Sequence, residues 1–293
     1  MMALNLPHSR SRGHKLDSTP HMTASPSHLG WLVKTGKVLR TQDGVPIELW
    51  TLNHQPNSKI LSAWAKHFRN HYCDDGQIDL LRNGTGHSRA DYLTKLKFPD
   101  AHATPGPSIR SGDFAEILIA DYVEYILGYW VPRTRYDDKT IRNESKKGSD
   151  TIGFRFQRDD NPSTEDTMLV FETKAQLSGT KARVILQNAI DDSAKDEIRK
   201  AESLNAIKQR LIDHKQLDQA AQVARFQSPE DNPYRSLYGA AALFTSEVLD
   251  ETVLSKSDAG KHPHKPRLAV IVLSGPNLME LVHNLYSLAA DEA

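Results

Sequence analysis

The sequence predicts an α/β (α+β) protein in which a mixed β-sheet is flanked by helices. After residue 106, segments with helical periodicity alternate with short apolar segments, as in layered domains. One apolar segment, residues 168–175, begins with a continuous apolar run, which indicates a strand covered on both faces. The composition agrees, because 38% hydrophobic and 25% charged residues in a chain of 293 are typical of a folded globular protein.

Composition also excludes several classes of protein. No apolar run approaches the ~18–20 residues that cross a bilayer, so we expect no membrane-spanning segment. The single cysteine, Cys73, excludes an intramolecular disulfide and a cysteine-based zinc cluster, and it fits a reducing, cytoplasmic compartment. The 37 basic and 37 acidic side chains cancel, which argues against a protein that coats nucleic acid by charge alone. A local basic groove remains compatible with this balance.

The first third of the chain is predicted to differ from the rest. Residues 1–30 are rich in Ser, His and Pro and lack helical or strand periodicity, which predicts a disordered leader. Residues 31–105 are predicted to form a smaller N-terminal subdomain, with a strand at 45–52 and an amphipathic helix at 60–72. A proline-rich linker then precedes the main domain, residues 106–293.

The main domain is predicted to alternate helices and strands. Ser111 can cap a helix that runs to about residue 128, and Asn277 can cap the final helix. The long, charged and glycine-free segment 182–226 predicts one or two further helices. Short apolar or alternating runs predict five strands, at residues 131–136, 150–156, 168–175, 237–245 and 268–274.

The first chemical signal lies at the end of the strand predicted for residues 168–175. Side chains alternate along a strand, so Met168, Val170, Glu172 and Lys174 share one face. That face begins apolar and ends in a carboxylate and an ammonium at the rim of the core, which is costly unless the charges pair or hold a ligand. Taken alone, Glu172 and Lys174 are better explained as a structural ion pair on a solvated strand end.

Two further acids favour a functional interpretation. Asp150 lies at the start of a predicted strand, behind Gly148, which permits either an ordinary tight turn or the close approach of a ligand. Glu116 lies on a helical stripe that is otherwise apolar, so its carboxylate should point toward the core. The other members of that stripe are Ala120, Val123 and Leu127. Together, Glu116, Asp150 and Glu172 offer oxygen ligands of the kind that Mg²⁺ prefers.

The order helix-Glu, strand-Asp, strand-Glu-x-Lys resembles the PD-(D/E)xK nuclease superfamily, from about residue 111 to residue 175. The resemblance implies a restriction-endonuclease-like core in which Asp150 and Glu172 bind metal ions, Mg²⁺ or Mn²⁺. It implies that Lys174 contacts the attacking water or the scissile phosphate and that Glu116 is a supporting metal contact. The chain departs from the superfamily at Ser149, where the family name has proline.

A closer resemblance covers about residues 110–200. Four motifs in order are similar to those of the HamA family, the nuclease subunits of Hachiman anti-phage systems. These motifs are Ser-Gly-Asp-Phe-Ala-Glu116, Lys-Gly-Ser-Asp150, Phe-Glu-Thr-Lys-Ala175 and Leu-Gln-Asn-Ala-Ile-Asp-Asp-Ser-Ala-Lys-Asp196. The resemblance implies a bacterial DNA nuclease that works with a HamB-like superfamily 2 helicase. The alternatives are a catalytically idle scaffold or DNA-binding subunit of the same fold, and a stand-alone restriction or repair nuclease.

Three weaker signals accompany these motifs. Gln187 is a secondary site candidate, because similar nucleases carry a polar residue on the helix after the Glu-x-Lys strand. Basic residues precede Asp150 and predict either a phosphate track or a solvated charged hairpin; they are Arg133, Arg135, Lys139, Arg142, Lys146 and Lys147. Aromatic residues are favoured at interfaces, so the N-terminal subdomain could dock a partner, although core positions are the default for its tryptophans, Trp31, Trp50 and Trp64.

Overall fold

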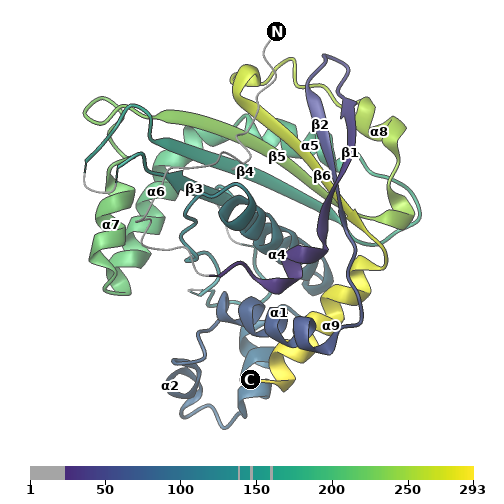
Figure 1. The fold of residues 1–293 in the computed structure, drawn as a ribbon. Coiled ribbons are helices and arrows are strands. Elements are labelled where there is room, and N and C mark those ends of the chain that lie inside the picture. The colour runs from purple at the N-terminus through teal and green to yellow at the C-terminus, as the bar shows by residue number, and fades with distance from the viewer. Residues whose placement is uncertain (1–23, 138, 146–147, 159–160) are drawn as a thin grey trace.

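A six-stranded mixed sheet forms the centre of the protein (Figure 1). The structure is a computed structural model that describes residues 24–137, 139–145, 148–158 and 161–293. The strands lie in the order β1-β2-β6-β5-β4-β3. Their bounds are β1 Leu32–Arg40, β2 Pro46–Leu52, β3 Thr151–Arg155, β4 Thr167–Gln176, β5 Arg235–Thr245 and β6 Leu268–Gly275.

Parallel pairing runs through the middle of the sheet. β2, β6, β5 and β4 are parallel neighbours, whereas β1 and β3 pair antiparallel at the two edges. Central parallel strands need cover on both faces, which accounts for the apolar start of β4. The predicted α/β (α+β) class, a mixed sheet flanked by helices as in the PD-(D/E)xK fold, is therefore confirmed.

Helices cover both faces of this sheet. On one face, α4 (Gly106–Asp121) packs on β4, and α1 (Ser58–Asn70) lies beside α9 (Leu278–Asp291). On the other face, α5 (Ile185–Ser193) packs on β4 and β5. The shorter elements are α2 Ile78–Arg82, α3 Arg89–Tyr92, α8 Glu251–Ser255, and the 3₁₀ or π turns η1 Ser27–Trp31, η2 Leu93–Lys97, η3 Tyr122–Ile126, η4 Ser246–Val248 and η5 Lys265–Arg267.

Because side chains alternate along β4, its two faces pack into different parts of the hydrophobic core, as predicted. Leu169 and Phe171 belong to the cluster that includes α4, whereas Met168 and Val170 pack with α6 (Asp196–Asp213) and α7 (Leu217–Ala224). None of the described helices is long and apolar enough to cross a bilayer. The sheet and its two apolar faces thus account for the architecture.

The predicted N-terminal subdomain shares the sheet and core of the main domain. β2 pairs in parallel with β6, so the sheet continues across the boundary predicted near residue 105. Trp50 and Trp64 are buried, and Trp31 packs against the ring of Trp64 with ring centroids 6.2 Å apart. Trp50 and Trp64 therefore occupy the core, whereas Trp31 is half-buried at its edge.

The leader predicted at residues 1–30 is only partly covered by the structure. Residues 1–23 lie outside the described residues. Ser27–Trp31 form η1, in which His28 and Leu29 are buried. The imidazole of His28 contacts the buried carboxylate of Asp121 at 3.0 Å. The described part of this segment is thus folded onto α4, and the prediction of disorder was wrong for it.

Three local predictions in the main domain were also wrong. Ser111 lies inside α4, which begins at Gly106, because a turn at Pro105 starts the helix earlier. Residues 131–136 form no strand; the neighbouring Trp130 makes a single antiparallel bridge with Phe154. The segment 182–226 forms three helices, since the chain breaks near Ala194 and again near Gln216. Asn277 does precede α9, in a left-handed conformation and without a side-chain cap.

Candidate active site

The antiparallel pair β3–β4 brings Asp150 to Glu172 and Lys174. Thr151, the first residue of β3, pairs with Phe171, so Asp150 reaches the end of β4. Its Oδ2 accepts the backbone N–H of Thr173 at 2.9 Å, which fixes the carboxylate between the two predicted site residues of β4. The register of one hairpin therefore assembles three of the predicted catalytic residues.

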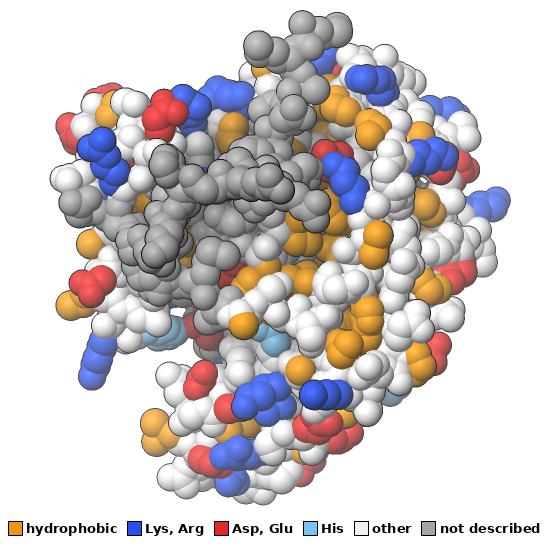
Figure 2. Space-filling model, in the orientation of Figure 1, with side chains coloured by type: hydrophobic (Ala, Val, Ile, Leu, Met, Phe, Trp, Pro, Cys, Tyr) orange, Lys and Arg blue, Asp and Glu red, His pale blue; other side chains and the backbone are white. Residues whose placement is uncertain are grey.

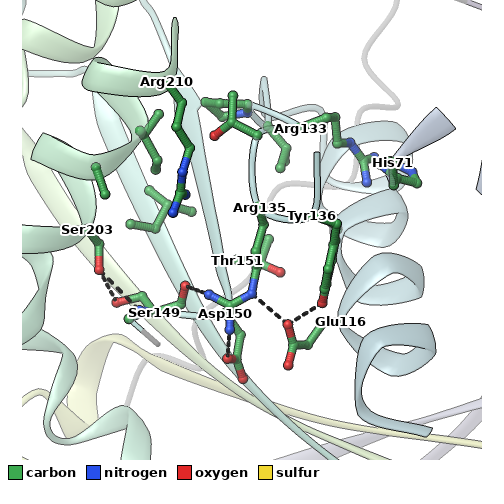
Figure 3. A pocket seen from close by; sticks show the side chains of 18 of the residues that line it. His71, Glu116, Arg133, Arg135, Tyr136, Ser149, Asp150, Thr151, Ser203 and Arg210 are labelled. Atoms are coloured by element: carbon green, nitrogen blue, oxygen red, sulfur yellow. Dashed lines mark hydrogen bonds and ion pairs between the residues drawn. The ribbon is translucent and has the colours of Figure 1, made fainter. Parts of the chain in front are cut away.

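Arg135 joins the fourth predicted residue to this group. Its guanidinium donates to Glu116 Oε2 at 2.7 Å, to Asp150 Oδ1 at 2.9 Å and to the carbonyl of Ser149 at 2.8 Å (Figure 3). The hydroxyl of Tyr136 also donates to Glu116 Oε2. Glu116 thus faces inward from α4, as its apolar stripe predicts, and it is held by the segment that links α4 to β3. We call residues 129–145 of this segment the connector.

Ser149 anchors the turn that carries Asp150. Its hydroxyl donates to Asp196 Oδ1 at 3.0 Å, and its backbone N–H donates to Ser203 Oγ at 3.1 Å. Asp196 is fully buried at the start of α6. A proline at position 149 would have no N–H for the second bond. Ser149, where the superfamily pattern has proline, therefore holds the turn of Asp150 through bonds that proline could not fully provide.

All four predicted residues line one open pocket of about 570 Å³. We call it the acidic pocket, because the described residues that line it include five carboxylates and two Lys or Arg side chains. The carboxylates are Glu116, Asp150, Glu172, Asp192 and Glu202, and the cations are Lys174 and Arg199. The remaining lining residues are small or polar. Such a pocket favours a cation and disfavours a bare phosphate.

Burial and mutual repulsion destabilise the charges of the two central acids. Burial raises the pKa of Asp150 to about 7, and the charge of Glu116 adds to this effect. Burial also raises the pKa of Glu172 to about 7, with Asp150 as the next cause. Both acids would keep their charge more easily beside a cation, because an opposite charge favours the ionised form.

The side chains present fit a divalent metal ion. Glu172 is 3% exposed, and its Oε2 is buried without a hydrogen-bond partner among the described residues. Its Oε1 pairs with Lys174 at 2.6 Å. A buried carboxylate oxygen without a partner is costly, and a metal ion would satisfy it. Oxygen donors of this kind suit Mg²⁺ or Mn²⁺ rather than a soft metal.

Lys174 is a fixed cation at the rim of this pocket. Its ammonium pairs with Glu172 at 2.6 Å and with Asp192 at 2.8 Å. Although burial opposes the charge, these two carboxylates raise the pKa of Lys174 above its ordinary value. The ammonium is therefore protonated at neutral pH, which suits electrostatic stabilisation and orientation better than proton abstraction.

The polar side chain that α5 contributes is Asp192, which the sequence interpretation missed. Gln187, the predicted candidate, is absent from the lining of the acidic pocket, and its amide bonds the backbone of Asp258 at 2.7 and 3.0 Å. Asp192 follows the buried Ile185 and Ala189 at spacings of seven and three. An acid on this apolar stripe was the available signal.

The predicted phosphate track is wrong for its described members, because each is engaged internally. Arg133 pairs with Asp121 at 2.8 Å, Lys139 with Asp113 at 2.8 Å, and Arg142 with Asp100 at 2.5 Å, while Arg135 holds the site. Lys146 and Lys147 lie outside the described residues. On the face shown in Figure 2, basic and acidic side chains of the described residues are interspersed.

Comparison with known proteins agrees with the motifs. The protein-family model HamA matches residues 27–289, which is nearly the whole chain. No curated protein matches the sequence. The match begins in η1 and includes all of the sheet.

Proposed function

The chain belongs to the HamA family of Hachiman defence subunits, and from this premise we propose that it is a metal-dependent DNA nuclease. The observation that carries the proposal is the buried Oε2 of Glu172, which has no hydrogen-bond partner among the described residues and lies beside Asp150 in the acidic pocket. A structural ion pair accounts for one oxygen of Glu172 and leaves the other unexplained. A metal ion bound at Oε2 accounts for the second oxygen.

In the proposed reaction, Asp150 and Glu172 hold the metal ion, with Glu116 as a supporting contact from α4. When bound, a divalent ion lowers the pKa of its water and neutralises charge at a phosphodiester. The Thr173 N–H and the Arg135 guanidinium orient Asp150. The Lys174 ammonium supplies a second positive charge at the pocket, where it can orient the attacking water or contact the scissile phosphate.

Plasmid cleavage tests this proposal. The purified protein should cut DNA with Mg²⁺ or Mn²⁺ and should stop when EDTA is added. Glu172→Gln and Lys174→Ala should lower the rate by at least ~10²-fold, as loss of one electrostatic contact to the reaction does. Glu165→Gln is the matched control, because this glutamate is exposed and pairs with Arg235 outside the acidic pocket.

Three outcomes would separate the proposal from its alternatives. Cleavage that persists in EDTA, after contaminating nucleases are excluded, would contradict the metal mechanism. DNA binding without cleavage under any metal would favour the idle DNA-binding or scaffold subunit. Unfolding of Glu172→Gln and Lys174→Ala, seen as loss of the thermal transition, would favour a purely structural ion pair.

We also propose a HamB-like superfamily 2 helicase as the partner and the bacterial cytoplasm as the location. Zero net charge gives the chain little long-range attraction for DNA, so a partner that brings DNA to it is physically reasonable. Co-expression with a neighbouring helicase gene, followed by size-exclusion chromatography, tests the association. Separate elution of the two proteins at micromolar concentration would favour the stand-alone nuclease. Deletion of residues 31–105 is unsuitable as a test, because it removes β2 from the sheet.

A further inference from the structure

A second pocket adjoins the acidic pocket and has the opposite character. Its volume is about 550 Å³, and Ser108 and Ala175 line both pockets. We call it the annex. The polar and basic side chains that line it are His102, Thr104, Ser108, Ser111, Gln176, Ser178, Arg183 and His283. The two shared lining residues place the annex directly beside the acidic pocket.

No carboxylate of the described residues lines the annex. Its three basic side chains, His102, Arg183 and His283, make no ion pair with any residue that the structure describes. This contrasts with the cations of the connector, which all have acidic partners. Asp100, two residues before His102, pairs with Arg142 and accepts backbone N–H groups of its own turn. The annex therefore offers basic groups that the fold itself leaves without acidic partners.

The fold positions the three basic residues from three different segments. Gln176, two residues after Lys174 on β4, accepts the backbone N–H of Arg183 at 2.8 Å and donates to the carbonyl of Lys181 at 2.7 Å. These bonds fix the loop after β4 so that Arg183 lines the annex. The turn that carries His102 is held by Asp100, whose Oδ1 accepts the N–H of His102 at 2.9 Å. His283 comes from α9.

The electrostatic surroundings of His283 agree with a positive potential in this region. Burial lowers the pKa of His283, and the nearby Arg110 and His102 lower it further. The annex also lies at the N-terminal end of α4, since Pro105, Pro107 and Ser108 line it. The positive end of the helix dipole adds to the potential there.

We propose that the annex binds the phosphodiester backbone of the DNA strand that is cleaved, next to the scissile phosphate. The inference rests on the proposed nuclease function and adds the groups that bind the substrate strand. The acidic pocket repels phosphate until a metal ion is present, so attraction for the strand has to come from outside it. The annex supplies that attraction beside the acidic pocket. Arg183 provides the permanent charge, and the two histidines and Ser111 provide hydrogen-bonding groups.

The test is the affinity of the full chain for a fluorescently labelled single-stranded DNA oligonucleotide, measured by anisotropy with Ca²⁺ in place of Mg²⁺. Arg183→Ala should raise Kd about 5–10-fold. The slope of log Kd against log salt concentration should fall by about one, as for the loss of one phosphate contact. Arg183→Lys should recover most of the affinity, because it restores the charge. Lys181→Ala is the matched control: it is an exposed cation of the same loop that does not line the annex, and its Kd should change less than about twofold.

Each outcome decides the proposal. If Arg183→Ala binds DNA as tightly as the unaltered protein, while the unaltered protein still cleaves plasmid, the proposed role of the annex is contradicted. The proposed nuclease function then remains. Equal losses for Arg183→Ala and Lys181→Ala would also contradict the role of the annex, since only general charge would then matter. If the unaltered protein neither binds nor cleaves DNA, the proposed function and the annex fail together.

Discussion

The connector and the annex contain similar basic side chains but use them differently. In the connector, Arg133, Arg135, Lys139 and Arg142 each pair with an acid of another segment. In the annex, Arg183 and two histidines line a pocket to which the described part of the chain contributes no carboxylate. The density of basic residues along the sequence therefore does not predict where an anion binds. What decides it is whether acids from other segments reach the cations in the fold.

The paired cations of the connector join the helices and turns that surround α4. Asp121, fully buried at the end of α4, accepts from Arg133 and contacts His28 and His67 at 3.0 and 2.9 Å. This one carboxylate thus links η1, α1 and the connector to α4. We expect substitutions in the connector to reduce stability and substitutions in the annex to reduce DNA binding.

The largest effect on stability should come from Lys139→Met. Lys139 is 2% exposed, and its ammonium pairs with the buried Asp113 at 2.8 Å. Removing the cation leaves a buried carboxylate unpaired, which should lower the free energy of unfolding by about 3–5 kcal/mol in urea denaturation. A loss below about 1 kcal/mol would show that the hydroxyl of Tyr72, 2.7 Å from Asp113, satisfies the acid alone.

Arg133→Gln should have a smaller effect, because its partners keep other contacts. We expect the free energy of unfolding to fall by about 2 kcal/mol, the value for hydrogen bonds between charged groups. Arg40→Gln is the control, since the partner of this exposed arginine among the described residues is the carbonyl of Gly44. A double-mutant cycle with Glu124→Gln measures the pairing directly. A coupling energy near zero would contradict the role of the connector as a clamp.

Gln176→Ala tests whether the loop that carries Arg183 must be fixed for the annex to bind DNA. It removes the bonds that fix the loop of Arg183 and should cost about 1 kcal/mol of stability. Because Arg183 would then have to be ordered on binding, the Kd for DNA should rise about 2–3-fold, less than for Arg183→Ala. An unchanged Kd would indicate that the loop needs no anchoring.

The smallest effect on stability should be that of Arg183→Ala itself. Arg183 is exposed and pairs with no acid that the structure describes, so the free energy of unfolding should change by less than about 0.5 kcal/mol. Thermal and urea unfolding of this variant beside Lys181→Ala checks the value. A loss above about 1.5 kcal/mol would mean that Arg183 belongs with the structural cations of the connector.

The signals that could be found in the sequence were local ones. Alternation and apolar runs predicted the strands from residue 150 onward, and the Glu-x-Lys strand end with an inward Glu116 predicted the acids of the pocket. Residues 131–136 of the connector were predicted to form a strand. In the structure Val131 and Tyr136 are buried, but the chain between them is irregular. The partners of Arg135 and the position of Gln187 depend on contacts between distant segments.

The annex could not have been predicted in the same way. His102, Arg183 and His283 come from a turn, a loop and the last helix, and no local pattern connects them. Asp192 differs, because its place on the apolar stripe of α5 was visible. Long-range proximity, which the sheet order creates, thus explains most of what sequence reasoning missed.

The central claim, that Asp150 and Glu172 form a metal site, is tested most directly by calorimetric titration of Mn²⁺ into the metal-free protein. The unaltered chain should bind Mn²⁺ saturably. Asp150→Asn and Glu172→Gln should each weaken binding by at least ~10-fold, while the exposed Glu165→Gln should leave it unchanged. Equal Mn²⁺ binding by all four proteins, or none by the unaltered chain, would contradict the claim.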